Sequence, residues 1–158
     1  MSSYTGTKGQ VSGIGAVISI GEVTGTSGTE TFTTIGEVTD VKFSGRKRDT
    51  VSVTSFGSGG VKRKLGTILD YGSATLTTIR VPGDAGQVAV IAANDAGVAY
   101  DFKIQLPVDA EAGQTTTGDL IAASGIVTES NFDISLTKAS EFTFTIEWDG
   151  AYTVTAGS

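Results

Sequence analysis

Apolar and polar residues alternate along much of this chain, most clearly in its second half. Every second residue from Tyr100 to Leu106 is apolar, and the residues between them are polar. Phe132–Thr137 and Phe142–Trp148 repeat the pattern. A period of two is typical of a strand with one face buried and the other in water. The short connection Lys138–Glu141 predicts that the last two of these strands form a hairpin.

Weaker strand signals occur elsewhere, where β-branched residues lie between glycine and serine residues that favour turns. The turn signal Asp149-Gly150 predicts one more strand after it, over Ala151–Thr155. The remaining strands that we expect are Val17–Ile20, Ile35–Phe43, Thr50–Phe56, Ser73–Val81 and Leu120–Val127.

One segment departs from the strand pattern. Asp84 and Gln87 stand three positions apart, as in a capping box, directly after Pro82-Gly83. They predict a helix over Ala85–Asp95 that ends before Gly97, with Val88, Ile91 and Ala92 on one face. The fold class is therefore mainly β, an antiparallel β-sandwich or barrel with one short α-helix.

The length of 158 residues predicts a single domain. Within it we expect residues 1–20 to form an N-terminal arm, for which flexibility is one interpretation. Residues 57–70 and 107–118 are expected to form long loops. Loops of this length are either mobile or become ordered against another subunit.

Composition excludes several kinds of chemistry. The chain has neither cysteine nor histidine, which excludes disulfides, thiol and imidazole catalysis and cysteine-bound zinc. Its carboxylates lack the spacing of a calcium loop, and we predict no catalytic residue, no metal site and no cofactor. A hydrolase with two carboxylates that meet in space ranks last among the alternatives.

Charge is unevenly distributed along the chain. Residues 1–83 carry a net +3 and residues 84–158 a net −9, within a total of −6. Two basic triplets hold six of the eleven cations, but no aromatic residue is interleaved as base stacking would favour. We expect the triplets to contact acidic groups of a neighbouring subunit, with solvated loop charge as the alternative interpretation. They are Arg46, Lys47 and Arg48, and Lys62, Arg63 and Lys64.

The order of these features resembles that of the major tail tube proteins of long-tailed, non-contractile bacteriophages. An early block, Ile35–Gly72, has an Ile-Gly-Glu-Val strand, then Asp49–Ser55, a long loop and the re-entry Leu65–Gly72. The helix, YDFKIQLP from Tyr100, an acidic loop and a closing FTFTIEWDGAYTV from Phe142 follow in similar order. The likeness spans residues 20–156.

The resemblance implies a virion structural protein without enzymatic activity. Its subunits would join into hexameric rings by extending one another's sheets, and the rings would stack into a hollow tube. The implied partners are further copies of the chain, a tape-measure protein, tail terminator and distal tail or baseplate proteins, and viral DNA in transit. The implied location is the tail of the virion, after synthesis in the host bacterial cytoplasm.

A channel for DNA is expected to be acidic or neutral, because a wall without cations does not hold phosphate. Asp101, Asp133 and Glu147 lie on polar strand faces and are our candidates for lining it. The main alternative is a β-sandwich module that binds a carbohydrate or a receptor through surface aromatic residues. No apolar run suits a membrane span, and the N-terminus does not resemble a signal peptide.

Overall fold

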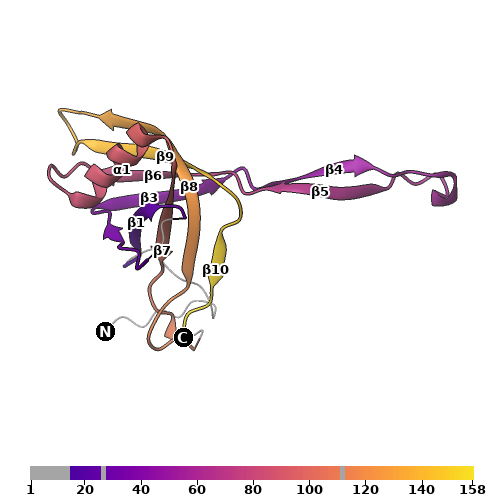
Figure 1. The fold of residues 1–158 in the computed structure, drawn as a ribbon, viewed down its shortest axis with the longest axis horizontal. Coiled ribbons are helices and arrows are strands. Elements are labelled where there is room, and N and C mark those ends of the chain that lie inside the picture. The colour runs from indigo at the N-terminus through magenta and orange to yellow at the C-terminus, as the bar shows by residue number, and fades with distance from the viewer. Residues whose placement is uncertain (1–14, 26–27, 111–112) are drawn as a thin grey trace.

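The structure, a computed structural model, describes residues 15–25, 28–110 and 113–158. It consists mainly of antiparallel strands, as the alternation predicts (Figure 1). In chain order the elements are β1 (Val17–Val23), β2 (Thr33–Thr34), β3 (Val38–Ser44), β4 (Lys47–Ser52), the 3-10 turn η1 (Phe56–Ser58), β5 (Lys64–Asp70), β6 (Ser73–Ile79), α1 (Ala85–Ala96), β7 (Ala99–Gln105), β8 (Leu120–Asp133), β9 (Glu141–Trp148) and β10 (Thr153–Thr155).

One long strand, β8, joins two half-sheets that cross steeply and enclose the core (Figure 1). Its first part pairs with β7 and β10, and its second part pairs with β9. The strand order is β2-β1-β7-β8-β9-β6-β3, with β10 beside β8. Gly125 lies at the junction, where an added Cβ would meet the Ile146 side chain at 2.5 Å. A side chain at this position would separate β8 from β9.

The core is built from the apolar faces of both half-sheets. Phe142, Phe144 and Ile146 of β9 and Leu76 of β6 are fully buried, and Phe102 of β7 faces them. The aromatic residues of β9, Trp148 included, thus belong to the core and not to a sugar-stacking surface. Alternation with period two therefore places the core residues of β7 and β9 correctly.

The helix begins at Ala85 as predicted and ends at Ala96, one residue beyond the predicted end, but of its predicted face only Ile91 packs against the core. The Asp84 carboxylate accepts from the Gln87 N–H at 2.9 Å, and Gly97 ends the helix at φ 66°. However, Val88 is 51% exposed, whereas Gln87 and Val90 are buried. Gln87 is stabilised there because its side chain bonds to main-chain groups of Ile79, Val81 and Gly36.

Two predicted strands and one predicted loop need correction. The expected strands 120–127 and 132–137 are one strand that ends at Asp133, so Ile134 and Leu136 lie exposed in the turn to β9. The hairpin itself is confirmed by the pairing of β8 with β9. The expected loop 57–70 contains β5, which pairs with β4.

At the N-terminus, residues 17–20 of the expected arm belong to β1, and residues 1–14 lie outside the described residues. Residues 107–118 contain no strand where they are described.

We predict that Phe144→Ala lowers the free energy of unfolding by about 3–5 kcal/mol, because it opens a cavity in a close-packed core. Chemical denaturation monitored by Trp148 fluorescence measures this. The matched control is Phe56→Ala, since Phe56 is fully exposed in the subunit, and it should change the stability little. Equal losses from the two substitutions would contradict the assignment of the core.

Candidate assembly surfaces

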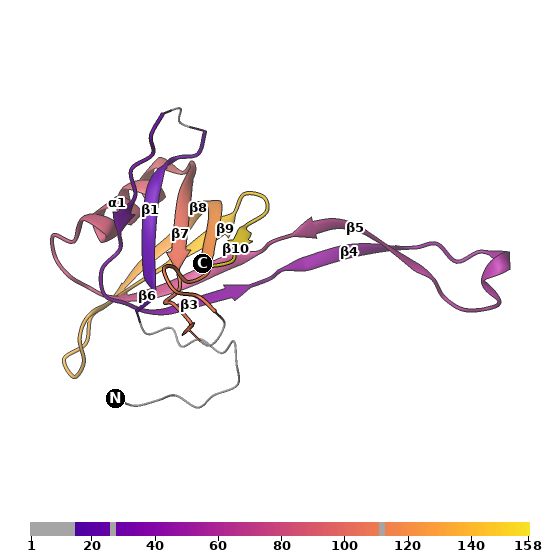
Figure 2. The same cartoon turned by 90° about the horizontal axis from the view of Figure 1, so that it is seen from below.

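A two-stranded ribbon, β4 and β5, projects from the body of the subunit (Figures 1 and 2). We call residues 45–72 the arm. It leaves the sheet at Gly45 and Gly72, whose main chains lie in close contact. An added Cβ on Gly72 would lie 2.1 Å from the Ser44 carbonyl oxygen, so a side chain at this position would collide with the main chain. Gly45 and Gly72 both have positive φ, which side chains disfavour. The arm therefore depends on glycine at its root.

The arm has an apolar stripe on one face. Val51 lies opposite Leu65 in the register, and the Val53 N–H donates to the Arg63 carbonyl at 3.0 Å. All three apolar side chains are about half exposed. Every described side chain of β4 and β5 is exposed except that of Leu69, which is half-buried. The stripe therefore lies in water in a single subunit.

The structure separates the two basic triplets. Arg46 lies at the root of the arm, with its guanidinium 5.0 Å from the centre of the Tyr71 ring, and Lys47 and Arg48 follow on β4. Lys62, Arg63 and Lys64 lie toward the far end of the arm, where they are exposed. Across the described residues, the ion pairs within 4.0 Å join Lys138 to Asp133 and Glu141. The distal triplet is thus a group of cations that form no ion pair with the described acids of their own subunit.

Asp101, Asp133 and Glu147 share the sheet face opposite the core, but not the same part of it. Asp101 on β7 accepts from the Thr24 hydroxyl at 2.9 Å and also from the Ser124 hydroxyl. Asp133 ends β8 and pairs with Lys138 at 3.1 Å. Glu147 is exposed on β9. The half-sheet β3-β6-β9-β8 carries Asp133 and Glu147, and the other half-sheet carries Asp101.

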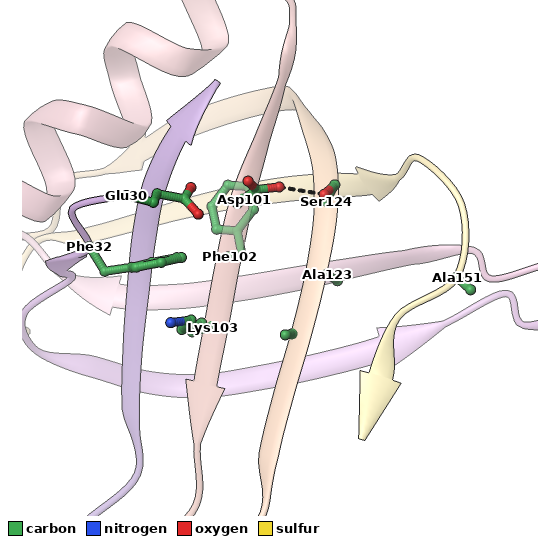
Figure 3. Close-up of a pocket in the computed structure, with 9 residues that line it drawn as sticks. Glu30, Phe32, Asp101, Phe102, Lys103, Ala123, Ser124 and Ala151 are labelled. Carbon is green, nitrogen blue, oxygen red and sulfur yellow. Dashed lines mark hydrogen bonds between the residues drawn. The ribbon is translucent and has the colours of Figure 1, made fainter. Parts of the chain in front are cut away.

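A pocket of about 250 Å³ lies over the half-sheet that carries Asp101 (Figure 3). The Glu30 carboxylate faces Asp101 there and accepts from the Glu22 N–H at 3.0 Å. Burial raises the pKa of Glu30, the Glu22 N–H opposes that rise, and the nearby Asp101 carboxyl adds to it. The hydrogen bond of Glu30 to the Glu22 N–H joins the segment around residue 30 to β1, and the hydrogen bonds of Asp101 join the end of β1 to β7 and β8.

No sequence pattern indicates this carboxyl pair. Glu30 lies in a polar stretch without periodicity, and its side chain lies in the space left by the glycine at position 21. An added Cβ at Gly21 would lie 2.4 Å from the Glu30 Oε1 atom. In the part of the chain that the structure describes, no group of three or more acidic residues could hold a metal ion. None of the helices described is long and apolar enough to cross a membrane.

Among the strands that the structure describes, the half-sheet β3-β6-β9-β8 has an unpaired edge on each side. β3 ends the strand order, so one side of its seven residues faces no other described strand. On the other side, β7 pairs with β8 only up to Ile126. Beyond it the α1 side chain Asn94 donates to the Val127 carbonyl at 3.0 Å and accepts from the Ser130 hydroxyl at 2.9 Å, and no second described strand pairs with residues 128–133. Such edges pair readily with an identical chain.

Comparison with solved structures places this arrangement among known folds. The chain of the SPP1 tail tube has a TM-score of 0.66 at 13% identity, covering 93% of this chain and 80% of that one. The tail of a gene transfer agent particle, refined with C6 symmetry, has a TM-score of 0.66 at 19% identity, and the match covers 93% of this chain and 100% of that one. A chain of the PVC sheath-tube complex, an extracellular contractile injection system, has a TM-score of 0.68 at 15% identity, and the match covers 94% of this chain and 93% of that one.

No protein-family model matches the sequence, and no curated protein matches it either. The structural likenesses nevertheless extend over nearly the whole chain. This chain therefore has the tail-tube fold, a mainly antiparallel β architecture with a single short helix, as its sequence predicts.

We predict that Glu30→Gln stabilises the subunit at pH 7. Because the pKa of Glu30 is raised in the folded state, wild-type stability is lost as pH rises through that pKa, above the ordinary value of 4.5. Glutamine keeps the acceptor for the Glu22 N–H and removes this loss. Thermal unfolding between pH 4 and pH 7 should show a difference that grows with pH.

The control for this substitution is Glu147→Gln, which makes the same change at an exposed position on β9. It should leave the melting temperature nearly unchanged over the same range. A Glu30→Gln variant that is less stable than the wild type at pH 7 would overturn the assignment.

Proposed function

We propose that this protein is a structural subunit of a virion tail tube and that it acts without enzymatic chemistry. The observation that carries the proposal is a tail-tube fold whose sheet ends in two free edges on opposite sides. A subunit with complementary surfaces on opposite sides associates head to tail, and such an association closes into a ring when the rotation permits.

The ring that we propose has six subunits, as in the gene transfer agent tail refined with C6 symmetry. Within one subunit β3 runs antiparallel to β8, because three antiparallel pairings separate them. Rotation about an axis along the strands preserves these directions. The β3 of one copy would then pair antiparallel with residues 128–133 of β8 in the next, and the half-sheets would form one continuous barrel.

The other half-sheet is a poorer candidate for closing the ring. Its outer strands are β2, with two residues, and β10, with three. The β3 edge offers seven residues. Since each paired residue contributes main-chain hydrogen bonds that are otherwise made with water, the longer edges favour the β3 and β8 contact.

This closure turns one particular face toward the channel. The face of β3-β6-β9-β8 opposite the core carries threonines on its two middle strands, with Thr75 opposite Thr145 and Thr77 opposite Thr143. Glu147 and Asp133 lie on the same face. Lys42 of β3, opposite Thr75, is a cation on this face, while the threonine hydroxyls and the carboxylates offer phosphate no positive charge, which suits DNA in transit without sequence-specific contacts. Asp101, on the other half-sheet, is then outside the channel wall.

Rings stacked along the same axis would form the tube. Its further partners would be a tape-measure protein within it, terminator and distal tail or baseplate proteins at its ends, and the viral genome during ejection. The location would be the virion tail, after synthesis in the host bacterial cytoplasm. The distal triplet Lys62, Arg63 and Lys64 would contact the adjacent ring, with the proximal Arg46, Lys47 and Arg48 near the ring boundary.

Electron microscopy of the purified protein should show rings or tubes with a central hole. Cross-linking between introduced cysteines then tests which edges meet. Any disulfide must join the introduced residues, because the chain has no cysteine of its own. We predict that a double variant, Lys42→Cys on β3 with Asn131→Cys on β8, gives a ladder of disulfide-linked species up to the hexamer on oxidation. Pairing position 42 with 129, or position 44 with 131, tests the neighbouring registers.

The two positions are three strand spacings apart in one subunit, about 14 Å, which is too far for an internal disulfide. Each single-cysteine variant serves as a control and should stop at the dimer. Wild-type protein that stays monomeric at every concentration and salt tested would refute the proposed assembly.

Replacing Lys62, Arg63 and Lys64 together by serine should weaken tube elongation more than ring formation. Exposed ion pairs are worth only about 0–1 kcal/mol each, so charge sets the register of stacking while the strand contact holds the ring. Added salt should reproduce the effect in the wild type. Sedimentation and electron microscopy separate rings from tubes, and an equal loss of both would contradict the assignment.

A further inference from the structure

The strands β7, β8 and β10 continue past the edge strand β3 on the core side of its half-sheet (Figure 1). A groove of about 290 Å³ lies between β3 and these strand ends, and the start of β1 also lines it. Val38 and Val41 of β3 pack against the core but remain partly exposed in the groove. The strand ends that extend over the groove, which we call the overhang, are residues 16–18, 104–106, 120–122 and 153–155.

A row of apolar side chains crosses the overhang on the face toward the core. Ile104 of β7 lies opposite Ile18 of β1. Ile121 of β8 lies opposite Ile104 on one side and opposite Val154 of β10 on the other. Residues directly opposite each other in antiparallel strands project from the same face. Ile18 and Ile104 are buried, whereas Val154 is 60% exposed, so the row begins in the core and ends in water.

The second half of β8 carries a side chain that matches this groove. Phe132 lies opposite Phe142, which is fully buried, and therefore projects from the core side of its half-sheet. Its ring lies 5.1 Å from that of Phe142 and 5.6 Å from the Arg80 guanidinium, yet Phe132 is 55% exposed. An aromatic side chain that is held in place and half in water is typical of an anchor in a protein interface.

The ring contact proposed above brings the groove and this aromatic ring together. That contact sets Lys42 of β3 opposite Asn131 of the next copy. One position along, Val41 then lies opposite Phe132. Val41 projects from the core side of β3, because it lies opposite the buried Leu76. Both side chains therefore point to the side of the joined sheet on which the overhang lies.

Charges on the channel face of the same pairing favour a second copy as the occupant of the groove. In this register Glu129 and Asp133 of the next copy lie diagonally on either side of Lys42. Asp40 comes opposite Asp133, whose charge is offset by Lys138 at 3.1 Å. The β3 edge thus meets a strand of complementary charge when that strand is β8 of another subunit.

We propose that the groove between β3 and the overhang receives Phe132 of the neighbouring subunit in the ring. Phe132 packs between Val41 below it and the row that ends in Ile121 and Val154 above it. Packed sheets lie about 10 Å apart, a gap that an aromatic and an aliphatic side chain fill together. This inference rests on the proposed ring and names an apolar contact that stabilises it. Main-chain pairing exchanges hydrogen bonds with water for little net gain, so apolar burial supplies most of the affinity.

Photo-cross-linking in assembled rings tests the contact. The probe is p-benzoylphenylalanine in place of Phe132, which keeps an aromatic ring at this position. In rings mixed from isotopically light and heavy subunits, it should link to Val41, Ile121 or Val154 of another copy. The control carries the same probe in place of Leu136, which is fully exposed in the turn of the same hairpin, and should not label these residues.

A charge introduced into the overhang gives an independent measurement. Val154→Asp should raise the subunit concentration needed for ring formation roughly tenfold, because it places a carboxylate against Phe132 in an apolar contact. The matched control is Thr155→Asp, since Thr155 is the next residue of β10 and projects from the opposite face. Both side chains are exposed in the subunit, so both variants should melt like the wild type. Equal effects of the two substitutions on ring formation overturn the groove contact.

The outcomes separate this inference from the proposed function. Rings in which the probe at position 132 links to other surfaces, or only within its own subunit, overturn the groove contact and leave the tube assembly standing. Wild-type protein that forms neither rings nor tubes overturns the tube assembly and the groove contact with it.

Discussion

Unpaired main-chain groups at the edges of a sheet are the constraint on which this structure depends. The half-sheet β3-β6-β9-β8 ends in two such edges, and its strand directions alternate so that a rotated copy presents the complementary edge. Monomeric β proteins protect their edges with charges, bulges or short strands. Here the edge strand β3 is seven residues long and leads directly into the arm.

Glycine decides how these surfaces are reached. At Gly72 the chain approaches the Ser44 carbonyl so closely that a side chain would prevent the arm from leaving the sheet as it does. At Gly125 the contact between β8 and β9 allows one strand to serve both half-sheets. In both places the missing Cβ permits two segments of main chain to meet. The chain's many glycines are in part a consequence of this close approach.

The candidate surfaces differ in how far the sequence reveals them. The basic triplets can be identified from the sequence alone, because the charge of a residue follows from its type and not from its position in the fold. Arg46 nevertheless stacks on Tyr71, whereas Lys62 and Arg63 lie exposed near the far end of the arm. The two triplets differ in environment because the hairpin of β4 and β5 places them at opposite ends of the arm. The Glu30 and Asp101 pair joins residues seventy-one positions apart, and no local pattern indicates such a contact.

The sequence by itself determined the antiparallel β class, the capped helix over residues 85–96 and the core face of β9, because period-two alternation and helix caps are local properties of the chain. Tertiary structure alone decided the continuity of β8, the pairing of β5 within an expected loop and the exposure of Val88. These features depend on which distant segment lies alongside. The free energy of such contacts comes from packing and pairing partners that neighbouring residues do not specify.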